Sequence, residues 1–398
     1  MDIQEYIEKL RNIQQSILTF IENEDNNEEN YENFNNNLEE QNIKNDQEDL
    51  KIFLHMIAKI SNNHHRSINF FMKIEKILDT LKTDIQSNFT NSEIFEIFRG
   101  NKRILLFLIE EKIVNIDKDI FQELMNSKYQ SSFYFEYFLP EIKTFIEESQ
   151  EDKETEGANY LNYDEIPKFD SEIFNEKRKN GENDGYLYTI IQKDSLDEYV
   201  TFVSQNDLPS QSFVELSIFE TNPFLLKREK TTLIEYSAFC GSKQIFKYLC
   251  DSGAELTPSL LLYSIHSNDV EIIDFLIENH IEPKLDQVTY ELCLKESIKC
   301  HHNEITNYIL NKFEDKQKSK ETIVPFCFQY YNFSFFPDVI RINSTFHFAC
   351  KYDYLTIVLL LFENDKIDIN AKLMNVHIMN ILMKRLCGLL QKKAMKKF

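Results

Sequence analysis

The chain has 398 residues, of which 42% are apolar, and its formal net charge is −22. That length exceeds a single compact core, so it predicts two or more units or one elongated array. Gly (7) and Pro (8) are scarce and Trp is absent, which disfavours turn-rich β folds and favours helices joined by short polar turns. An acidic chain repels phosphate backbones, so the charge argues against nucleic-acid binding.

The first 150 residues predict a helical N-terminal region. Residues 2–21 place apolar side chains at helical spacing, which indicates one amphipathic helix. Residues 22–49 are rich in Asn, Asp and Glu, and we interpret most of them as an acidic, mobile loop of low complexity. Three apolar side chains leave a helical alternative open there: Tyr31, Phe34 and Leu38.

The middle of the chain predicts a boundary. Residues 151–185 are acidic, have weak periodicity and contain Gly157, Pro167 and Gly181, so we expect a linker. After it the sequence begins to resemble itself, and we assign residues 186–371 to a repeat array.

One copy of the repeat begins at Thr232. It continues with the small pair Ser237-Ala238, then Gly241, Ile245 and Gly253-Ala254. This order resembles the ankyrin repeat, whose pattern runs Thr-Pro-Leu-His-x-Ala-Ala-x-x-Gly-His-x-Glu-Ile-Val and closes with Gly-Ala. Leu233 and Glu235 stand where that family has Pro and His, and we expect these changes to weaken the N-terminal cap of the first helix.

Further copies support the resemblance. The Glu-Ile pairs that begin at Glu271 and Glu304 are 33 residues apart (304 − 271), which is the ankyrin period, whereas Gly241 and Asn268 are 27 apart (268 − 241). A late copy of the repeat starts at Thr345. An earlier copy covers residues 187–202 and has Asp194 at the Gly position. A degenerate copy covers 326–337 with Asn332 at the turn, and a fourth segment, 94–114, fits the pattern loosely. Small residues lie where two helices approach closely, and residues able to adopt positive φ follow: Gly241, Asn268 and Asp353.

The resemblance implies an all-α fold, namely an ankyrin-type helix-turn-helix solenoid preceded by a helical N-terminal region. The eroded motifs and the Asn, Ile and Phe bias are similar to divergent ankyrin proteins of some protists. One helix pair cannot bury its aliphatic stripe alone, so copies of this kind stack.

No enzyme, cofactor or metal is predicted. The chain has no clustered Gly for a phosphate loop and no nucleophile motif beside His64-His65-Arg66, which we interpret as a turn or solvated helix face. Four residues were candidates for zinc: Cys293, Cys300, His301 and His302. Because the last three are adjacent and point to different sides, we interpret them as part of an inter-helix turn.

Cysteine usage and hydropathy predict a cytoplasmic protein. The seven cysteines are irregularly spaced, which fits reduced thiols, and the acidic start does not read as a secretory leader. The basic, amphipathic stretch 372–398 has three open interpretations: a capping or disordered tail, a helix for a partner, or a membrane-surface helix.

The function that the resemblance implies is a non-catalytic scaffold that binds another protein on the concave face of the array. Carried over position by position, ten residues belong to that face, either as binding anchors or as packing between repeats: Tyr236, Phe239, Cys240, Tyr263, His266, Ser267, Lys299, Cys300, Lys351 and Tyr352. The alternative is a membrane-surface adaptor anchored by 372–398, and an enzyme ranks third.

Overall fold

The protein is all-α, as predicted. A computed structural model describes residues 1–23, 25, 28–67, 69–125, 133–151, 171–228, 230–283, 288–312, 323–338 and 340–363. Within these ranges it has 23 α-helices and one 3-10 turn, and the β-type pairing is a single isolated bridge between Phe213 and Thr232. The predicted tail 372–398 lies outside the described residues. No helix among the described residues is long and apolar enough to cross a bilayer.

The chain divides into two compact units at places other than the predicted linker. Unit 1 combines residues 1–56 with 314–398, and unit 2 comprises residues 57–313. The late repeat copy at Thr345 therefore belongs to unit 1, together with the N-terminal helix, and the copies between 187 and 310 belong to unit 2.

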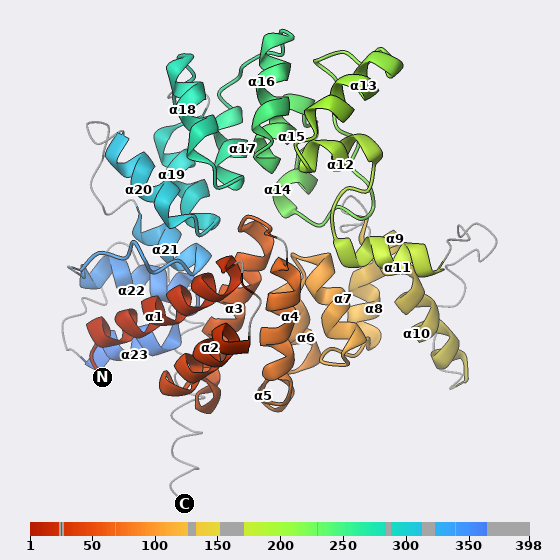
Figure 1. Ribbon diagram of the computed structural model, residues 1–398. Coiled ribbons are helices and arrows are strands. Elements are labelled where there is room, and N and C mark those ends of the chain that lie inside the picture. The colour runs from red at the N-terminus through yellow and green to blue at the C-terminus, as the bar shows by residue number, and fades with distance from the viewer. Residues whose placement is uncertain are drawn as a thin grey trace, which may run out of the picture. The chain divides into compact units, whose positions relative to one another are not determined.

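Unit 1 is built from helices at both ends of the chain (Figure 1). They are α1 (Ile3–Glu22), α2 (Glu28–Glu40), η1 (Ile43–Asn45), the first part of α3 (Gln47–Asn63), α21 (Val324–Tyr330), α22 (Ile342–Lys351) and α23 (Leu355–Glu363). Helix α1 packs against α2 and also against α23, while α21 and α23 both pack on α22.

The predicted acidic loop at 22–49 is mostly helical. Residues 28–40 form α2, and its buried side chains are Phe34 and Leu38. Phe34 stacks on Phe20 of α1 with ring centroids 5.0 Å apart. The loop prediction was wrong because two apolar residues at i and i+4 are enough to hold a polar helix against a larger apolar surface.

Polar pairs connect the two sequence segments of unit 1. The Gln14 amide donates to the Asn332 side-chain oxygen at 2.8 Å, and the Phe333 N–H donates to the Gln14 carbonyl oxygen at 2.7 Å. Gln14 and Asn332 are fully buried. Buried polar groups need such partners, so this exchange fixes how α1 meets residues 332–333.

Unit 2 starts with the end of α3 and continues through α20. Its other helices are α4 (Phe70–Thr80), α5 (Lys82–Asn88), α6 (Asn91–Phe98), α7 (Lys102–Glu110), α8 (Lys118–Met125), α9 (Tyr134–Tyr137), α10 (Leu139–Glu151), α11 (Ser171–Asn180), α12 (Tyr186–Gln192), α13 (Leu196–Asn206), α14 (Pro223–Leu226), α15 (Leu233–Cys240), α16 (Lys243–Asp251), α17 (Leu260–His266), α18 (Val270–Glu278), α19 (Tyr290–Lys299) and α20 (Asn303–Lys312).

The second half of the predicted linker is part of the core of unit 2. Helix α11 buries Arg178, whose guanidinium donates to the Tyr137 carbonyl at 3.0 Å and to Glu141 at 2.7 Å. Residues 152–170 lie outside the described ranges. The linker prediction was wrong for 171–185 because a buried Arg with charged and carbonyl partners leaves no apolar periodicity to detect.

Four helix pairs follow one another in unit 2: α12–α13, α15–α16, α17–α18 and α19–α20. The first helices of these pairs pack in succession, α12 on α15, α15 on α17 and α17 on α19, and α13 packs on α16 (Figure 1). The aliphatic stripes of the second helices are buried, as Ile245, Ile272 and Ile305 show.

The turn inside each of these pairs contains one residue in the left-handed region. These residues are Asp194, Gly241, Asn268 and His301, and unit 1 has Tyr331 and Asp353 at the corresponding turns. The predicted positive φ at Gly241, Asn268 and Asp353 is confirmed, whereas at the degenerate copy it falls on Tyr331 and not on Asn332. In unit 2 the next N–H donates five residues back, from Ser195 to Ile190, Ser242 to Ser237 and His302 to Ser297, which satisfies a carbonyl at the helix end.

The cap of α15 is intact, contrary to the prediction from Leu233 and Glu235. The Glu235 N–H donates to the Thr232 hydroxyl, and the Glu235 carboxylate accepts from the Thr232 N–H at 2.9 Å. Glu at the third helical position completes a capping box, so replacing His by Glu strengthens this helix start.

Candidate functional site

The ten predicted binding residues do not form one exposed surface. Five are buried in unit 2: Tyr236, Tyr263, His266, Ser267 and Cys300. Three others in unit 2 are half-buried: Phe239, Cys240 and Lys299. Lys351 is exposed and Tyr352 half-buried, but both belong to unit 1. The five buried residues therefore agree with the alternative interpretation, packing between helices, and partner binding by the other five stays a prediction.

Helix α14 explains why the inner positions are buried. Phe224 places its ring 4.1 Å from the ring of His266 and 4.9 Å from that of Tyr263, measured between centroids. The Tyr263 hydroxyl also lies 3.2 Å from the Thr231 hydroxyl. The segment before Thr232 thus covers positions that an open array leaves exposed.

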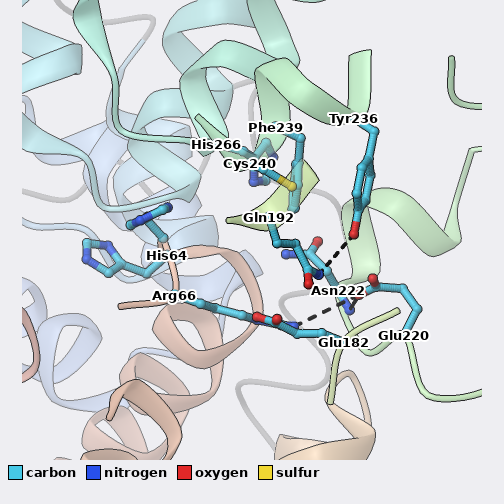
Figure 2. A pocket seen from close by; sticks show the side chains of 11 residues that line it. His64, Arg66, Glu182, Gln192, Glu220, Asn222, Tyr236, Phe239, Cys240 and His266 are labelled. Carbon is cyan, nitrogen blue, oxygen red and sulfur yellow. Dashed lines mark hydrogen bonds and ion pairs between the residues drawn. The ribbon is translucent and has the colours of Figure 1, made fainter. Parts of the chain in front are cut away.

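A cavity of about 240 Å³ remains beside this cover (Figure 2). All of its lining residues belong to unit 2, and most of them are polar: His64, His65, Arg66, Glu182, Gln192, Glu220, Asn222, Tyr236, Phe239, Cys240 and His266. We name it the polar pocket. In Figure 2, Arg66, Glu182 and Glu220 lie on one side of it, and Tyr236, Phe239 and Cys240 of α15 on the other.

Arg66 is held by the backbone and side chains around it. Its guanidinium donates to the Gly181 carbonyl and to the Thr221 hydroxyl, each at 2.9 Å, and lies 3.9 Å from the Glu220 carboxylate. The Arg66 side chain is 11% exposed and that of Glu220 is 3% exposed. Glu220 in turn accepts from the Asn222 N–H at 2.7 Å. These two opposite charges therefore largely compensate each other.

Glu182 differs from Glu220. Within the described part of the chain its carboxyl group has no hydrogen bond and no ion pair closer than 4 Å. Burial raises the pKa of Glu182, the charge of Arg66 partly opposes that rise, and Glu220 adds to it. A carboxyl group in this situation costs free energy when it ionises, because neither water nor a protein donor solvates it fully.

Burial favours the neutral form of four other titratable groups in the polar pocket. Burial and the neighbouring His64 lower the pKa of His65 to about 4. Burial also lowers the pKa of His266, and it raises the pKa of the Cys240 thiol and the Tyr236 hydroxyl. The Gln192 amide donates to that hydroxyl at 3.0 Å. Among the described residues, Glu182 is therefore the carboxyl group of the pocket that has neither a hydrogen bond nor an ion pair.

One buried cluster has side chains that metals use. His266, Glu296 and Cys300 place one ligand atom each within 4.8 Å of one another. However, the Glu296 carboxylate already binds the His266 Nε2 at 2.7 Å and the Lys299 ammonium at 2.6 Å. A metal ion would have to displace both, so we interpret the cluster as a hydrogen-bonded network. Cys293 and His301, two of the sequence candidates, are not part of it.

The His64-His65-Arg66 segment is not a solvated face. His64 is buried, its Nδ1 lies 2.9 Å from the Cys300 carbonyl, and its ring meets that of His302 at 4.8 Å. His302 accepts from the His65 N–H at 3.1 Å. These contacts with the turn between α19 and α20 hold the segment in place, so they position Arg66 at the pocket.

A second cavity of about 630 Å³ adjoins the polar pocket and shares Arg66, Glu182 and Gln192 with it. We name it the adjoining groove. Met72 and Ile173, which are 42% and 51% exposed, lie along it. Exposed large apolar side chains beside buried polar groups are typical of binding sites.

Four of the residues that the sequence predicts for binding line the polar pocket, namely Tyr236, Phe239, Cys240 and His266, but the sequence indicated none of its charged residues. The sequence predicts a turn or a solvated helix face at Arg66 and a linker at Glu182. The Gly and Asn residues between Gly181 and Gly185 indicate a turn of the chain, but nothing in this segment indicates where the Glu182 side chain lies.

Comparisons with known proteins gave no match to a family model, to a curated protein or to a solved structure.

Proposed function

We propose that unit 2 is a non-catalytic protein-interaction module of the ankyrin type and that the whole chain acts as a scaffold in the cytoplasm. The observation that carries the proposal is the succession α12, α15, α17 and α19, in which each first helix packs on the next and each pair turns through a left-handed residue. Stacked helix pairs of this kind present extended surfaces for partners.

The polar pocket and the adjoining groove are the proposed binding site. They lie beside the first helices α12, α15 and α17, on which the resemblance expected recognition, but they are completed by residues that precede the repeats. The Cys240 thiol is unsuited to nucleophilic catalysis because burial raises its pKa. A binding role therefore agrees better with this site than a catalytic one.

A crosslinking experiment on the full-length chain tests this assignment. Random peptides displayed on phage are selected on the protein, and a photoreactive residue is placed at Met72 or, as a control, at Phe213. Both side chains are exposed, at 42% and 52%, but only Met72 lines the groove. We expect selected peptides to crosslink at 72 and not at 213. Equal crosslinking at both positions, or no enriched peptide, would contradict the proposed site.

The alternative of a membrane-surface adaptor depends on residues 372–398. Because these lie outside the described residues, it stays a prediction. Co-sedimentation with anionic liposomes, comparing the full-length chain with a chain ending at residue 371, tests it.

A further inference from the structure

The polar pocket has a chemical asymmetry that the scaffold proposal does not use. Its positive charge, Arg66, is already bound by Gly181, Thr221 and Glu220, while Glu182 contributes a second carboxyl group without a hydrogen-bonded partner in the described part of the chain. The side chains opposite, Tyr236 and Phe239, are aromatic. A half-buried carboxyl group that faces aromatic rings across a cavity is suited to a cation.

We propose that the polar pocket receives one basic side chain, a lysine or arginine, of a protein partner whose backbone lies in the adjoining groove. The inference rests on the proposed function of unit 2 and names the chemistry that its site recognises. The ammonium or guanidinium group binds Glu182, and its aliphatic stem lies along Tyr236 and Phe239.

The size of the cavity agrees with a side chain as occupant. Pockets for small molecules usually have volumes of about 300–1,000 Å³. The polar pocket, at about 240 Å³, is smaller than that range, whereas the adjoining groove, at about 630 Å³, has room for a stretch of peptide. The shared residues Arg66, Glu182 and Gln192 place the entrance to the pocket along the groove.

The charges of the polar pocket also agree with a basic side chain as occupant. His65, His266, Cys240 and Tyr236 are neutral at neutral pH for the reasons given above, so they neither repel nor replace a bound cation. Arg66 and Glu220 compensate each other. One added positive charge therefore balances an ionised Glu182, whereas an anion would add a further negative charge beside Glu182 and Glu220.

The test uses the full-length chain and the peptides selected in the crosslinking experiment. Each basic residue of a selected peptide is replaced in turn by a neutral residue of similar length, lysine by norleucine and arginine by citrulline. Binding is measured by titration calorimetry to the wild type, to Glu182→Gln and to Glu198→Gln. Glu198 is exposed on α13, so the control variant removes the same charge away from the pocket.

We expect one neutral replacement in the peptide to weaken binding by at least about tenfold, as for loss of a charge-assisted hydrogen bond. Glu182→Gln should weaken binding of the parent peptide to a similar extent, and the two changes together should cost no more than either alone. Glu198→Gln should leave the affinity within about twofold of the wild type. Glu182→Gln should fold, because the substitution removes no hydrogen bond or ion pair of this carboxyl group in the described part of the chain.

Three results would overturn the inference. The proposed recognition of a basic side chain would be contradicted if the selected peptides lacked basic residues. It would also be contradicted if the losses of affinity from the peptide change and from Glu182→Gln were additive. Both results would leave the proposed scaffold function unaffected. Absence of any selected peptide would remove the proposed function itself, and binding of n-butylammonium, titrated alone as a probe, would in that case assign the pocket to a free amine.

Discussion

Glu182 of unit 2 differs from two buried polar groups of unit 1, Gln14 and Asp49, in how it is partnered. In unit 1 the Gln14 amide meets Asn332 and Phe333, and the Asp49 carboxylate accepts from Tyr6 at 2.5 Å and from Lys9 at 2.6 Å. In unit 2, Glu182 faces a cavity instead of a donor. Paired polar groups specify how segments pack, whereas an unpaired one costs free energy that a ligand can recover.

Helix pairs of similar sequence therefore lie in two different surroundings in this chain. The late pair α22–α23 is packed against α1 and stabilises unit 1. The pairs of unit 2 carry a cover formed by α14 and by the segments around Glu182 and Glu220, and this cover leaves a pocket. The predictions below test that contrast.

The largest effect is expected from Tyr236→Ala. Tyr236 is 1% exposed, and truncating a buried aromatic side chain of this size destabilises a fold by about 3–5 kcal/mol. Tyr352→Ala, at a half-buried position of unit 1, should cost much less. Urea unfolding with hydrogen exchange measured separately in each unit checks this. Equal losses at both positions would mean that Tyr236 is not a core residue.

Next comes Gln14→Leu, which removes the contact between the two segments of unit 1. It leaves the Asn332 amide and the Phe333 N–H without these partners, so we expect a loss of about 2–3 kcal/mol. Gln15→Leu is the matched control, because Gln15 is exposed one position further along α1. Faster amide exchange across 323–338 in the first variant only would confirm the contact; similar exchange in both would contradict it.

Two carboxyl groups of unit 2 should respond to neutralisation with opposite signs. Burial alone would raise the pKa of Glu296, but the His266 hydrogen bond and the charge of Lys299 outweigh it and lower the pKa to about 2. Its ionised form therefore stabilises the fold above the ordinary carboxyl pKa of about 4.3, and this contribution is lost as the pH falls toward 2. Glu296→Gln should cost about 1–3 kcal/mol at pH 7.

Glu182 has a raised pKa, so its ionised form opposes folding. Glu182→Gln should raise the thermal midpoint at pH 7, and the gain should disappear below about pH 4.3, where the wild type is protonated in both states. Midpoints of both Gln variants from pH 2.5 to 8 check the pair. A destabilising Glu182→Gln at pH 7 would show that this carboxyl group has a partner in the fold.

The smallest expected change in stability distinguishes two turns that have the same backbone geometry. Asp194 and Asp353 have φ of 52° and 64°, which Gly adopts without strain, so a change to Gly isolates the side chain. Asp194 accepts from the Gln244 and Ile245 N–H groups, each at 3.0 Å, and thereby caps α16 of the next pair. Asp353 makes a partly exposed ion pair with Lys51.

Asp194→Gly should therefore cost about 1 kcal/mol, as for loss of a helix cap. Asp353→Gly should change stability by less than about 0.5 kcal/mol, because a partly exposed ion pair contributes little. Denaturant midpoints of the two variants measure the difference. If Asp353→Gly costs as much as Asp194→Gly, the turn conformation and not the cap determines the effect.

The sequence by itself determined the local features of the protein. Helical spacing predicted the all-α class, and small residues followed by a turn residue located the left-handed positions at Gly241, Asn268 and Asp353. These features depend on side chains within a few residues of one another, because helix periodicity and turn geometry are set over one or two turns of backbone.

The tertiary structure alone decided which segments meet. Gln14 and Asn332 are 318 residues apart, and the Arg66, Glu182 and Glu220 side of the pocket comes from three separate stretches of unit 2. The sequence predicts Tyr236 and His266 on an exposed concave face, but both are buried, and Phe224, which lies outside the predicted repeat copies, packs on His266. Burial of this kind depends on long-range packing, which leaves no periodic signal in the sequence around either partner.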